Sequence, residues 1–393
     1  MNRTIIKFRV WLLLLALYVG APNALAYTTI IDGIYYYIDK TNYTASVTHG
    51  SGASSQNSYA GNVTIPSSVY YNGANYPVKS IDEAAFKGCS GLKSVTIPNS
   101  VTVIGAEAFY GCPELTSIII PKWVHTINGN AFYGCSGLTS IIIPSNVKVI
   151  GGNPFGGCTG LTSIVVEDGN SVFDSRGGCN SIINTSSNTL VSGCKNTIIP
   201  DNVTTIGNKA FNSYSNLTSI NIPNSVTTIG QSAFSECSSL TSVNIPNSVT
   251  TIGNSAFYKC SSLTSISIPE GVESIGNNAF EGCINLTSVT INNNVFVSEN
   301  RTSETSFCTI FGPQVTNYIL EDDVITIGDM AFLGCSNLIS ITIPNSVTTI
   351  GQSAFAECSS LTSVNIPNSV TTIGEYNQEI MGKTNVEIIP VSA

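Results

Sequence analysis

The sequence predicts an α/β repeat solenoid, in which about thirteen short coils stack into an elongated right-handed superhelix. Phenylalanine recurs every 23 residues, as at Phe86 and Phe109, and a cysteine follows three residues after nearly every one of them. Residues 222–253 and 343–374 are identical at every position but one. Self-similarity at this period is typical of stacked units, each of which buries its apolar side chains against its neighbours.

Each coil is predicted to contain two short strands and a turn. Residues 240–245 (LTSVNI) end in an alternation of apolar and polar side chains, which is typical of a half-buried strand, and Pro246 ends it because proline has no amide hydrogen. A second extended segment at 249–252 directs its apolar side chains into the same core. Gly253 permits a tight backbone turn, and residues 256–257 (AF) fill the core from a short helical or 3-10 turn.

The repeat also predicts how the chain is divided. We expect a solenoid at 63–374, an N-terminal cap with short strands at 27–62, and a C-terminal cap or tail at 375–393. A stack of strands needs caps because its terminal edges otherwise expose unpaired backbone groups. Three steps of the repeat are longer than 23 residues, and we expect their additional residues to form loops on one side: the steps from Pro66 to Pro98, from Glu167 to Pro200 and from Asn292 to Glu321.

The first 26 residues have the pattern of a secretory signal peptide. Residues 1–9 carry three cations and no acid, the apolar run 10–19 (VWLLLLALYV) follows, and residues 24–26 (ALA) supply the small side chains of a cleavage site. We expect cleavage after Ala26 and a secreted or cell-surface protein. The apolar run is about half of the roughly 20 residues that span a bilayer, and no later segment is long enough, so we expect no transmembrane segment in the mature chain.

The composition argues against several classes of function. Charged residues make up 10% of the chain, against about 25% in an ordinary globular protein, and the formal net charge is −9. Nucleic-acid binders need clustered lysine and arginine, so we expect no nucleic-acid partner. His49 and His125 are the two histidines, and the sequence has no GxSxG, HExxH, CxxC or complete P-loop motif. We therefore predict that the protein is not an enzyme and has no cofactor and no metal ion.

Nine of the twelve cysteines occupy one position of the repeat, beside the phenylalanine and leucine of the core. Cysteines stacked in this way have parallel Cβ vectors, which suit the dihedral angle of a disulfide badly. We predict a ladder of buried free thiols that act as small apolar side chains. Cys179, Cys194 and Cys308 lie outside this position, and a bond between Cys179 and Cys194 stays an open alternative.

Three consecutive coils carry apolar residues at an outward strand position that is polar in most other coils. We expect Ile119, Ile142 and Val165 to stack on one face as an exposed apolar stripe, a feature that often marks an interaction site. The coil of Ile119 also has Trp123 and His125 where other coils have serine or threonine, and tryptophan is a favoured interface anchor. These five residues are the candidate binding patch. The alternative is that an insertion or neighbouring loop covers the stripe, or that these residues have drifted without function.

The repeated string LTS[IV]xIPxxVxxIGxxAFxxC, from about residue 63 to 374, resembles the 23-residue BspA-like class of leucine-rich repeat found in bacterial surface proteins. The irregular stretches 170–200 and 295–328 are similar to recurring variants in that family. The resemblance implies a leucine-rich-repeat solenoid and a non-catalytic, adhesin-like surface protein, whose partners are host extracellular-matrix or cell-surface proteins, other cells or glycans. The alternative is a structural or self-associating envelope spacer without a specific ligand.

Overall fold

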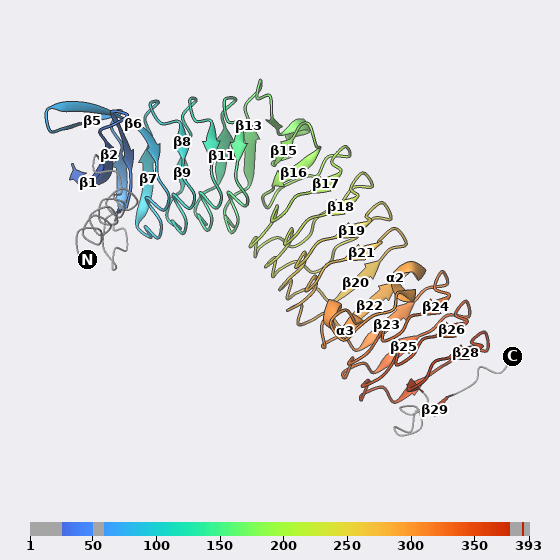
Figure 1. The fold of residues 1–393 in the computed structure, drawn as a ribbon. Coiled ribbons are helices and arrows are strands. Elements are labelled where there is room, and N and C mark those ends of the chain that lie inside the picture. Colours follow the sequence, from blue (N-terminus) through green and yellow to red (C-terminus); the bar gives the residue numbers. More distant parts are fainter. Residues whose placement is uncertain (1–25, 50–58, 378–386, 389–393) are drawn as a thin grey trace, which may run out of the picture.

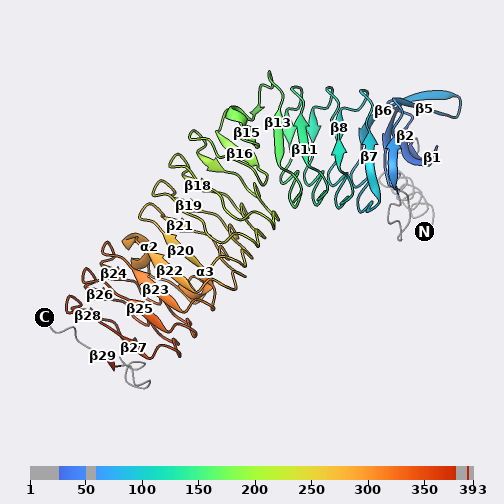
Figure 2. The same cartoon turned by 180° about the vertical axis from the view of Figure 1, so that it is seen from behind.

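The computed structural model describes residues 26–49, 59–377 and 387–388. Figure 1 shows an elongated stack of short strands with one pronounced bend between β13 (Ser163–Val166) and β16 (Thr189–Ser192), and Figure 2 shows the same bend from behind. The predicted repeat solenoid, with many short strands and few helices, is present. The number of coils and the handedness of the superhelix stay predictions.

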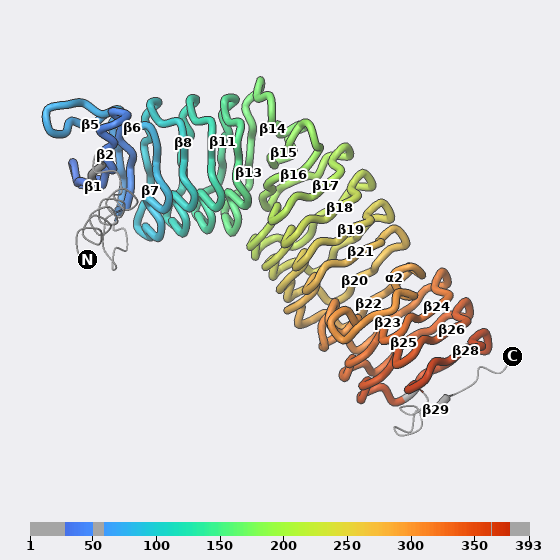
Figure 3. The backbone as a smooth tube through the Cα atoms, in the orientation of Figure 1, coloured from blue at the N-terminus to red at the C-terminus, as the bar shows by residue number. Residues whose placement is uncertain are grey.

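Two walls of the solenoid are mostly parallel sheets, and the tube in Figure 3 shows how each coil passes through both. The strands of the first wall are β4 (Gly61–Thr64), β7 (Leu92–Thr96), β9 (Ser117–Ile118), β11 (Ser140–Ile143), β13, β20 (Ser265–Ile268), β22 (Ser288–Ile291), β23 (Asn317–Leu320), β25 (Ser340–Thr342), β27 (Ser363–Val364) and β29 (Glu387–Ile388). The repeated strands of the second wall are β8 (Val103–Ile104), β10 (Thr126–Ile127), β12 (Val149–Ile150), β17 (Thr205–Ile206), β18 (Thr228–Ile229), β19 (Thr251–Ile252), β21 (Ser274–Ile275), β24 (Thr326–Ile327), β26 (Thr349–Ile350) and β28 (Thr372–Ile373).

Alternation along the first wall places one side chain in the core and the next in solvent. Val243 and Ile245 are buried, whereas Asn244 between them is exposed, so the predicted in–out–in pattern is confirmed. Val249 and Ile252 enter the same core from the second wall. Each fully buried side chain of this size contributes about 1.5–3 kcal/mol, and the coils above and below supply the cover.

The third side of each coil is a column of turns, here called the turn column. The sequence predicts a short helical or 3-10 turn here, and in the regular coils among the described residues that prediction is wrong. Cys260 N donates to Phe257 O at 3.1 Å, but Ser255 has a φ of 54°. This left-handed residue interrupts the helical path, so single turns do not continue into a helix. Each turn instead bonds to the next coil, as Phe257 N does to Ala279 O at 2.8 Å.

The phenylalanine rings of the turn column stack along the solenoid. The rings of Phe234 and Phe257 have centroids 5.3 Å apart and planes within 8° of each other. The stack runs through the coils at 86–155 and again through those at 211–280. An aromatic pair stabilises the folded state by about 0.5–1.5 kcal/mol in addition to the effect of its burial. The repeated phenylalanine therefore stabilises the contact between neighbouring coils as well as filling the core.

An antiparallel meander covers the N-terminal end of the stack. Its strands are β1 (Ala26–Ile31), β2 (Ile34–Asp39) and β3 (Thr44–Val47), and β3 pairs in parallel with β6 (Ala74–Ile81). The first long step of the repeat forms a hairpin of β5 (Ser68–Tyr71) with β6, which projects from the stack in Figure 1. The boundary of the predicted cap at residue 62 stays a prediction. The predicted signal peptide lies outside the described residues, apart from Ala26.

The bend coincides with residues 167–200, here called the first insertion. It contains β14 (Phe173–Asp174), η1 (Arg176–Gly178), β15 (Ile182–Asn184) and β16. These strands join the second wall in the order β14-β15-β16-β17. The turn column gains no phenylalanine between Phe155 and Phe211, because Phe173, which lies between them in sequence, belongs to β14. The wall therefore gains strands that the turn column lacks, and the solenoid bends toward the turn column (Figure 1).

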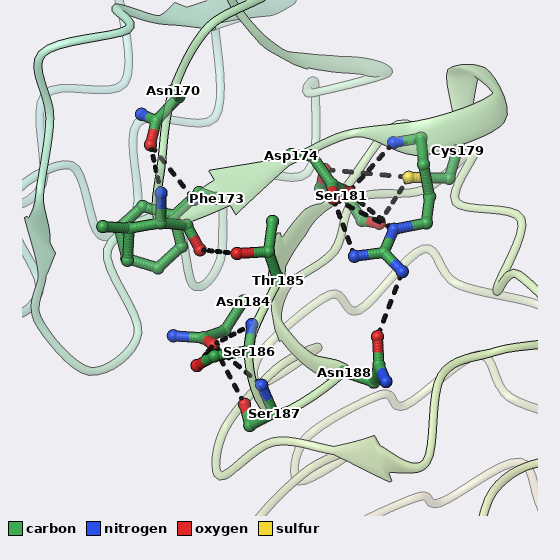
Figure 4. Close-up of polar contacts among 12 residues, drawn as sticks. Asn170, Phe173, Asp174, Cys179, Ser181, Asn184, Thr185, Ser186, Ser187 and Asn188 are labelled. Carbon is green, nitrogen blue, oxygen red and sulfur yellow. Dashed lines mark hydrogen bonds and ion pairs between the residues drawn. The ribbon is translucent and has the colours of Figure 1, made fainter.

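Short polar contacts hold the first insertion in shape (Figure 4). Arg176 Nη2 lies 2.7 Å from Asp174 Oδ2, and Arg176 Nη1 donates to Asn188 Oδ1 at 3.0 Å. Asn184 Oδ1 accepts hydrogen bonds from the amides of Ser186 and Ser187, which forms a tight turn at the end of β15. These polar residues are satisfied by one another, so they act as a structural network.

Residues 292–321, here called the second insertion, contain the helices α2 (Asn294–Ser298) and α3 (Phe307–Phe311). The buried side chain of Arg301 joins them. Arg301 Nη1 donates to Thr305 O at 3.0 Å and Nη2 donates to Phe296 O at 2.5 Å. Its guanidinium also lies 4.4 Å and 4.6 Å from the ring centroids of Phe296 and Phe307. Burial lowers the pKa of Arg301 to about 10, which is high enough to keep it charged at neutral pH.

Candidate binding surface

The apolar stripe predicted from the sequence is exposed on the outside of the first wall. Ile119, Ile142 and Val165 are 83%, 55% and 44% exposed, respectively. Ile142 and Val165 are direct partners in the pairing of β11 with β13, and Ile119 precedes Ile142 by one repeat. The isoleucines and valines on either side of each are buried, so strand alternation directs these three side chains outward.

The first insertion follows the stripe directly and leaves it uncovered. Val166 N donates to Ser175 Oγ at 2.9 Å, and Glu167 N donates to Ile143 O at 2.9 Å, which fixes the beginning of the insertion against β11. Exposure decreases toward the insertion, yet Val165 stays more than two-fifths exposed. Among the described residues, no segment covers the stripe as the alternative interpretation requires.

Trp123 lies at the corner between the two walls and is 50% exposed. In other coils this position is often serine, whose hydroxyl bonds to the backbone of the preceding coil: Ser248 Oγ donates to Val226 O at 2.8 Å. Tryptophan cannot make that bond, and its ring stays at the surface with Lys122 Nζ 5.3 Å from the ring centroid. A cation over an exposed indole is worth about 0.5–1 kcal/mol, so the lysine helps to orient the ring.

His125 lies on the second wall, in a row that runs along the stack of coils. The row consists of Lys79, Thr102, His125 and Lys148, joined by backbone bonds: Thr102 N to Lys79 O, His125 N to Thr102 O, and Lys148 N to His125 O, at 2.8, 2.9 and 2.8 Å. The side chains of Lys79, His125 and Lys148 are exposed. In the coils just beyond the bend the same row holds threonines, so the two lysines and the histidine are local to the N-terminal arm of an acidic chain.

The structure therefore divides the five candidate residues between two surfaces. The apolar stripe is on the first wall and His125 is on the second, and the buried side chain of Val124 separates His125 from the corner at Trp123. Sequence reasoning missed Val149, which is 51% exposed on the second wall and pairs with Thr126. The sequence feature that could have identified Val149 is a valine at a repeat position that usually holds threonine.

The predicted ladder of buried free thiols is confirmed. All twelve cysteines are free, and every one except Cys308 is buried. Cys179 and Cys194 are not bonded: the thiol of Cys179 lies 3.0 Å from Ser181 Oγ, and that of Cys194 donates to Asn180 O at 3.2 Å. Burial raises the pKa of ladder thiols, to about 12 for Cys158, so they stay protonated and are poor nucleophiles at neutral pH.

Hollows also occur outside the candidate patch. A shallow groove of about 500 Å³ follows the turn column beside Ser213, Glu236 and Lys259, and a smaller cavity of about 150 Å³ lies between the second insertion and β21. In the part of the chain that the structure describes, no three His, Cys, Asp or Glu side chains converge as a metal ion would require. No helix among these residues has both the length and the hydrophobicity to cross a membrane.

Comparison with known proteins agrees with this architecture. A family model described as a BspA type leucine rich repeat region (6 copies) matches residues 56–184, 181–307 and 303–388. A leucine-rich repeat protein of known structure from Bacteroides ovatus ATCC 8483 is 26% identical, with a TM-score of 0.54, over 93% of this chain and 100% of that one.

The fold is also similar to that of the pneumococcal vaccine antigen PcpA, which is 18% identical with a TM-score of 0.59, over 94% of this chain and 100% of that one. No curated protein matches the chain. The repeat, the two walls, the phenylalanine stack and the family model cover most of the sequence. The chain belongs to the family of BspA-type leucine-rich repeat proteins.

Proposed function

We propose that the chain is exported and acts at a bacterial cell surface as a non-catalytic, adhesin-like binding protein. The observation that carries the proposal is the exposed apolar stripe next to Trp123. Ile119 alone is 83% exposed, and a row of such side chains has a favourable free energy of transfer into an interface. The family and the signal-peptide pattern at residues 1–26 support export.

The scaffold supports binding because it is ordered before a partner arrives. The strand carrying Ile142 is fixed by its pairing with the strand of Val165, and the row of His125 is fixed by backbone bonds on both sides. A partner that docks on such a surface loses little free energy to the ordering of the protein. The fold therefore presents an anchor whose geometry does not depend on the ligand.

The electrostatics favour a partner with a mixed surface. Trp123 and the stripe suit an apolar patch, and the adjacent Lys122 and Lys148 suit acidic groups at its edge. Host extracellular-matrix proteins, cell-surface proteins and glycans are the partner classes that the family resemblance implies. Rim charges act mainly on the association rate, so we expect binding that weakens moderately with salt.

A double variant tests the proposed site. The purified exported chain is measured against a panel of matrix proteins and polysaccharides, and then Ile119→Ser with Trp123→Ala is compared on every partner found. We expect at least tenfold weaker binding with an unchanged thermal midpoint, because both side chains are exposed. The matched control is Ile325→Ser with Ile339→Ser, which removes side chains that are 50% and 56% exposed in the C-terminal arm. Equal losses of binding affinity in the two double variants would contradict the proposed binding site.

The spacer function is the second candidate, and the edge strand β1 favours it. This six-residue strand has no charged residue and no proline, and among the described residues it pairs only with β2. Unprotected edges of this kind join chains together. Concentration-dependent self-association in sedimentation, with no captured partner on the panel, would favour the spacer over the adhesin.

A further inference from the structure

The cavity of about 150 Å³ between the second insertion and β21, here called the insertion cavity, has a floor and a rim of different chemistry. The floor consists of buried side chains of the second insertion: Phe296, Arg301 and Ile310. The rim includes the exposed residues Glu273, Asn277 and Glu299. Apolar surface with a few polar groups placed around it is typical of sites for small ligands.

Arg301 has a hydrogen-bond donor that the protein does not use. Its Nη1 donates to Thr305 O, and its Nη2 donates to Phe296 O and lies 3.2 Å from Glu299 Oε2. Its Nε is buried and has no partner among the described residues, and Arg301 as a whole is only 6% exposed. Buried polar groups nearly always have a hydrogen-bond partner, so this donor favours a ligand that brings an acceptor oxygen.

The rim makes the opposite demand on a ligand. Glu273 comes directly before β21 and Glu299 directly after α2, so the two carboxylates enter the rim from the second wall and from the second insertion. An ionised carboxylate only accepts hydrogen bonds, whereas the side-chain amide of Asn277 both donates and accepts. A ligand in the insertion cavity therefore needs donors as well as acceptors.

The charges around the insertion cavity select against ionic ligands. An anion would lie close to the carboxylates of Glu273 and Glu299, and a small cation would lie close to the buried guanidinium of Arg301. A neutral ligand with hydroxyl groups avoids both repulsions. Each hydroxyl can donate to a carboxylate and accept from an amide or a guanidinium.

The size of the insertion cavity fits one six-membered ring. A cavity of about 150 Å³ engineered into another protein binds a single benzene molecule. A pyranose ring has a similar framework, with C–H groups on its faces and hydroxyls around its edge. The side chains of Phe296 and Ile310 offer apolar surface to the C–H groups, and the rim offers partners to the hydroxyls.

We propose that the insertion cavity binds one neutral pyranose sugar. Its hydroxyls donate to Glu273 and Glu299 and accept from Asn277 and Arg301. A free monosaccharide and one residue of a neutral glycan share this chemistry. The insertion cavity lies in the C-terminal arm, beyond the bend and away from the apolar stripe (Figure 1), so the site does not depend on the proposed function.

Two arginines, Arg176 and Arg301, occur in residues 27–393, and this makes a selective experiment possible. The purified exported chain is labelled with ¹⁵N-arginine, and D-glucose, D-galactose, D-mannose and N-acetyl-D-glucosamine are titrated separately while the two Nε–H resonances are recorded. We expect the Arg301 resonance to shift saturably with at least one of these sugars. The Arg176 resonance is the internal control and should not move, because its Nε already donates to Asp174 Oδ1 at 2.8 Å.

Neutral oligosaccharides built from the same sugars distinguish the two sources of the ligand. Tighter binding of an oligosaccharide than of its free sugar assigns the insertion cavity to a residue of a glycan, and the reverse order assigns it to a free monosaccharide. The apolar-stripe variant, Ile119→Ser with Trp123→Ala, is expected to bind the sugar as the wild-type chain does. Failure of the stripe and failure of the insertion cavity are therefore separate results.

A double variant tests the rim directly. Glu273→Ala with Asn277→Ala removes two exposed side chains, and we expect it to bind the sugar at least about tenfold more weakly because hydrogen bonds to the ligand are lost. The matched control is Glu114→Ala with Asn202→Ala, which removes an exposed acid and an exposed amide elsewhere and should leave the affinity unchanged. Thermal unfolding verifies that both variants are folded.

Two outcomes overturn the proposal. One is an Arg301 Nε resonance that none of the sugars or oligosaccharides shifts, which would mean that the insertion cavity holds water only. The other is unchanged affinity in the folded Glu273→Ala and Asn277→Ala variant. If that variant does not fold, Glu273→Gln takes its place, since it keeps the size of the side chain and removes the charge, and unchanged affinity in it overturns the proposal equally.

Discussion

The hydroxyl of Tyr214 donates a 3.0 Å hydrogen bond to the carbonyl oxygen of Phe155, 59 residues earlier in the chain. In a regular coil a cysteine makes this bond, as Cys260 does with Phe234 O at 3.1 Å. The first insertion separates the two coils in sequence at the bend, and the longer tyrosine side chain reaches the equivalent carbonyl. Tyr214 therefore continues the ladder across the bend and helps to hold the two arms of the solenoid together.

Tyr214→Phe removes this hydroxyl and keeps the ring. Phe155 O also accepts a hydrogen bond from Cys158 N, so the carbonyl keeps one donor and the cost is that of one buried bond. We expect the free energy of unfolding to decrease by about 0.5–1.5 kcal/mol. Urea unfolding measures it, and Tyr70→Phe, which changes a side chain that is 71% exposed, is the control. Equal urea midpoints for Tyr214→Phe and Tyr70→Phe would show that the Tyr214 hydroxyl does not stabilise the bend.

Gly253 illustrates why a glycine follows the second strand of most coils. A Cβ at this position would lie 2.6 Å from Gln231 N and 2.7 Å from Gly230 C, both backbone atoms of the preceding coil. We expect Gly253→Ala to destabilise the protein by about 1–3 kcal/mol, because the ladder must shift to admit the methyl group. Gly152→Ala is the matched control, since a Cβ there meets nothing within 4 Å. Thermal unfolding compares them, and a similar midpoint shift in both would contradict the steric argument.

The regular coil could be predicted because its period, its apolar positions and its proline all point to one structure. Val243 and Ile245 are buried around the exposed Asn244 as alternation requires. The turn column could not be predicted, because its left-handed position is occupied by residues as different as Ser255 and Met330. Backbone bonds to the neighbouring coil select that conformation, and they are not visible in a local pattern of side chains.

The candidate site was predictable in part for the same reason. Alternation gives the outward direction of Ile119 and Ile142, and both are exposed. Alternation does not say how the chain turns a corner, so the position of His125 on the second wall required coordinates. The bend could not be predicted from the sequence either, because the length of the first insertion does not indicate that its strands join the second wall alone.

Arg301 is predicted to hold the second insertion together. Arg301→Met keeps much of the side-chain volume but removes the donors to Phe296 O and Thr305 O. We expect amide hydrogen exchange across residues 294–311 to become at least tenfold faster, because two carbonyls lose charged donors that are worth about 1.5–3 kcal/mol each. Lys195→Met, at an exposed residue, is the control. Unchanged exchange in Arg301→Met would show that packing alone maintains α2 and α3.

The pH dependence of alkylation tests the environment of Cys308 directly. Only the thiolate reacts, and the hydrogen bond with Cys335 lowers the pKa of Cys308 from 9.0 to about 7. The rate with iodoacetamide should therefore rise with pH and reach half of its maximum near pH 7, as measured by mass spectrometry of the Cys308 peptide. Cys335→Ala removes the donor that stabilises the thiolate, so the half-maximal pH should increase toward 9. A half-maximum that is the same in both proteins would mean that Cys335 does not control the ionisation of Cys308.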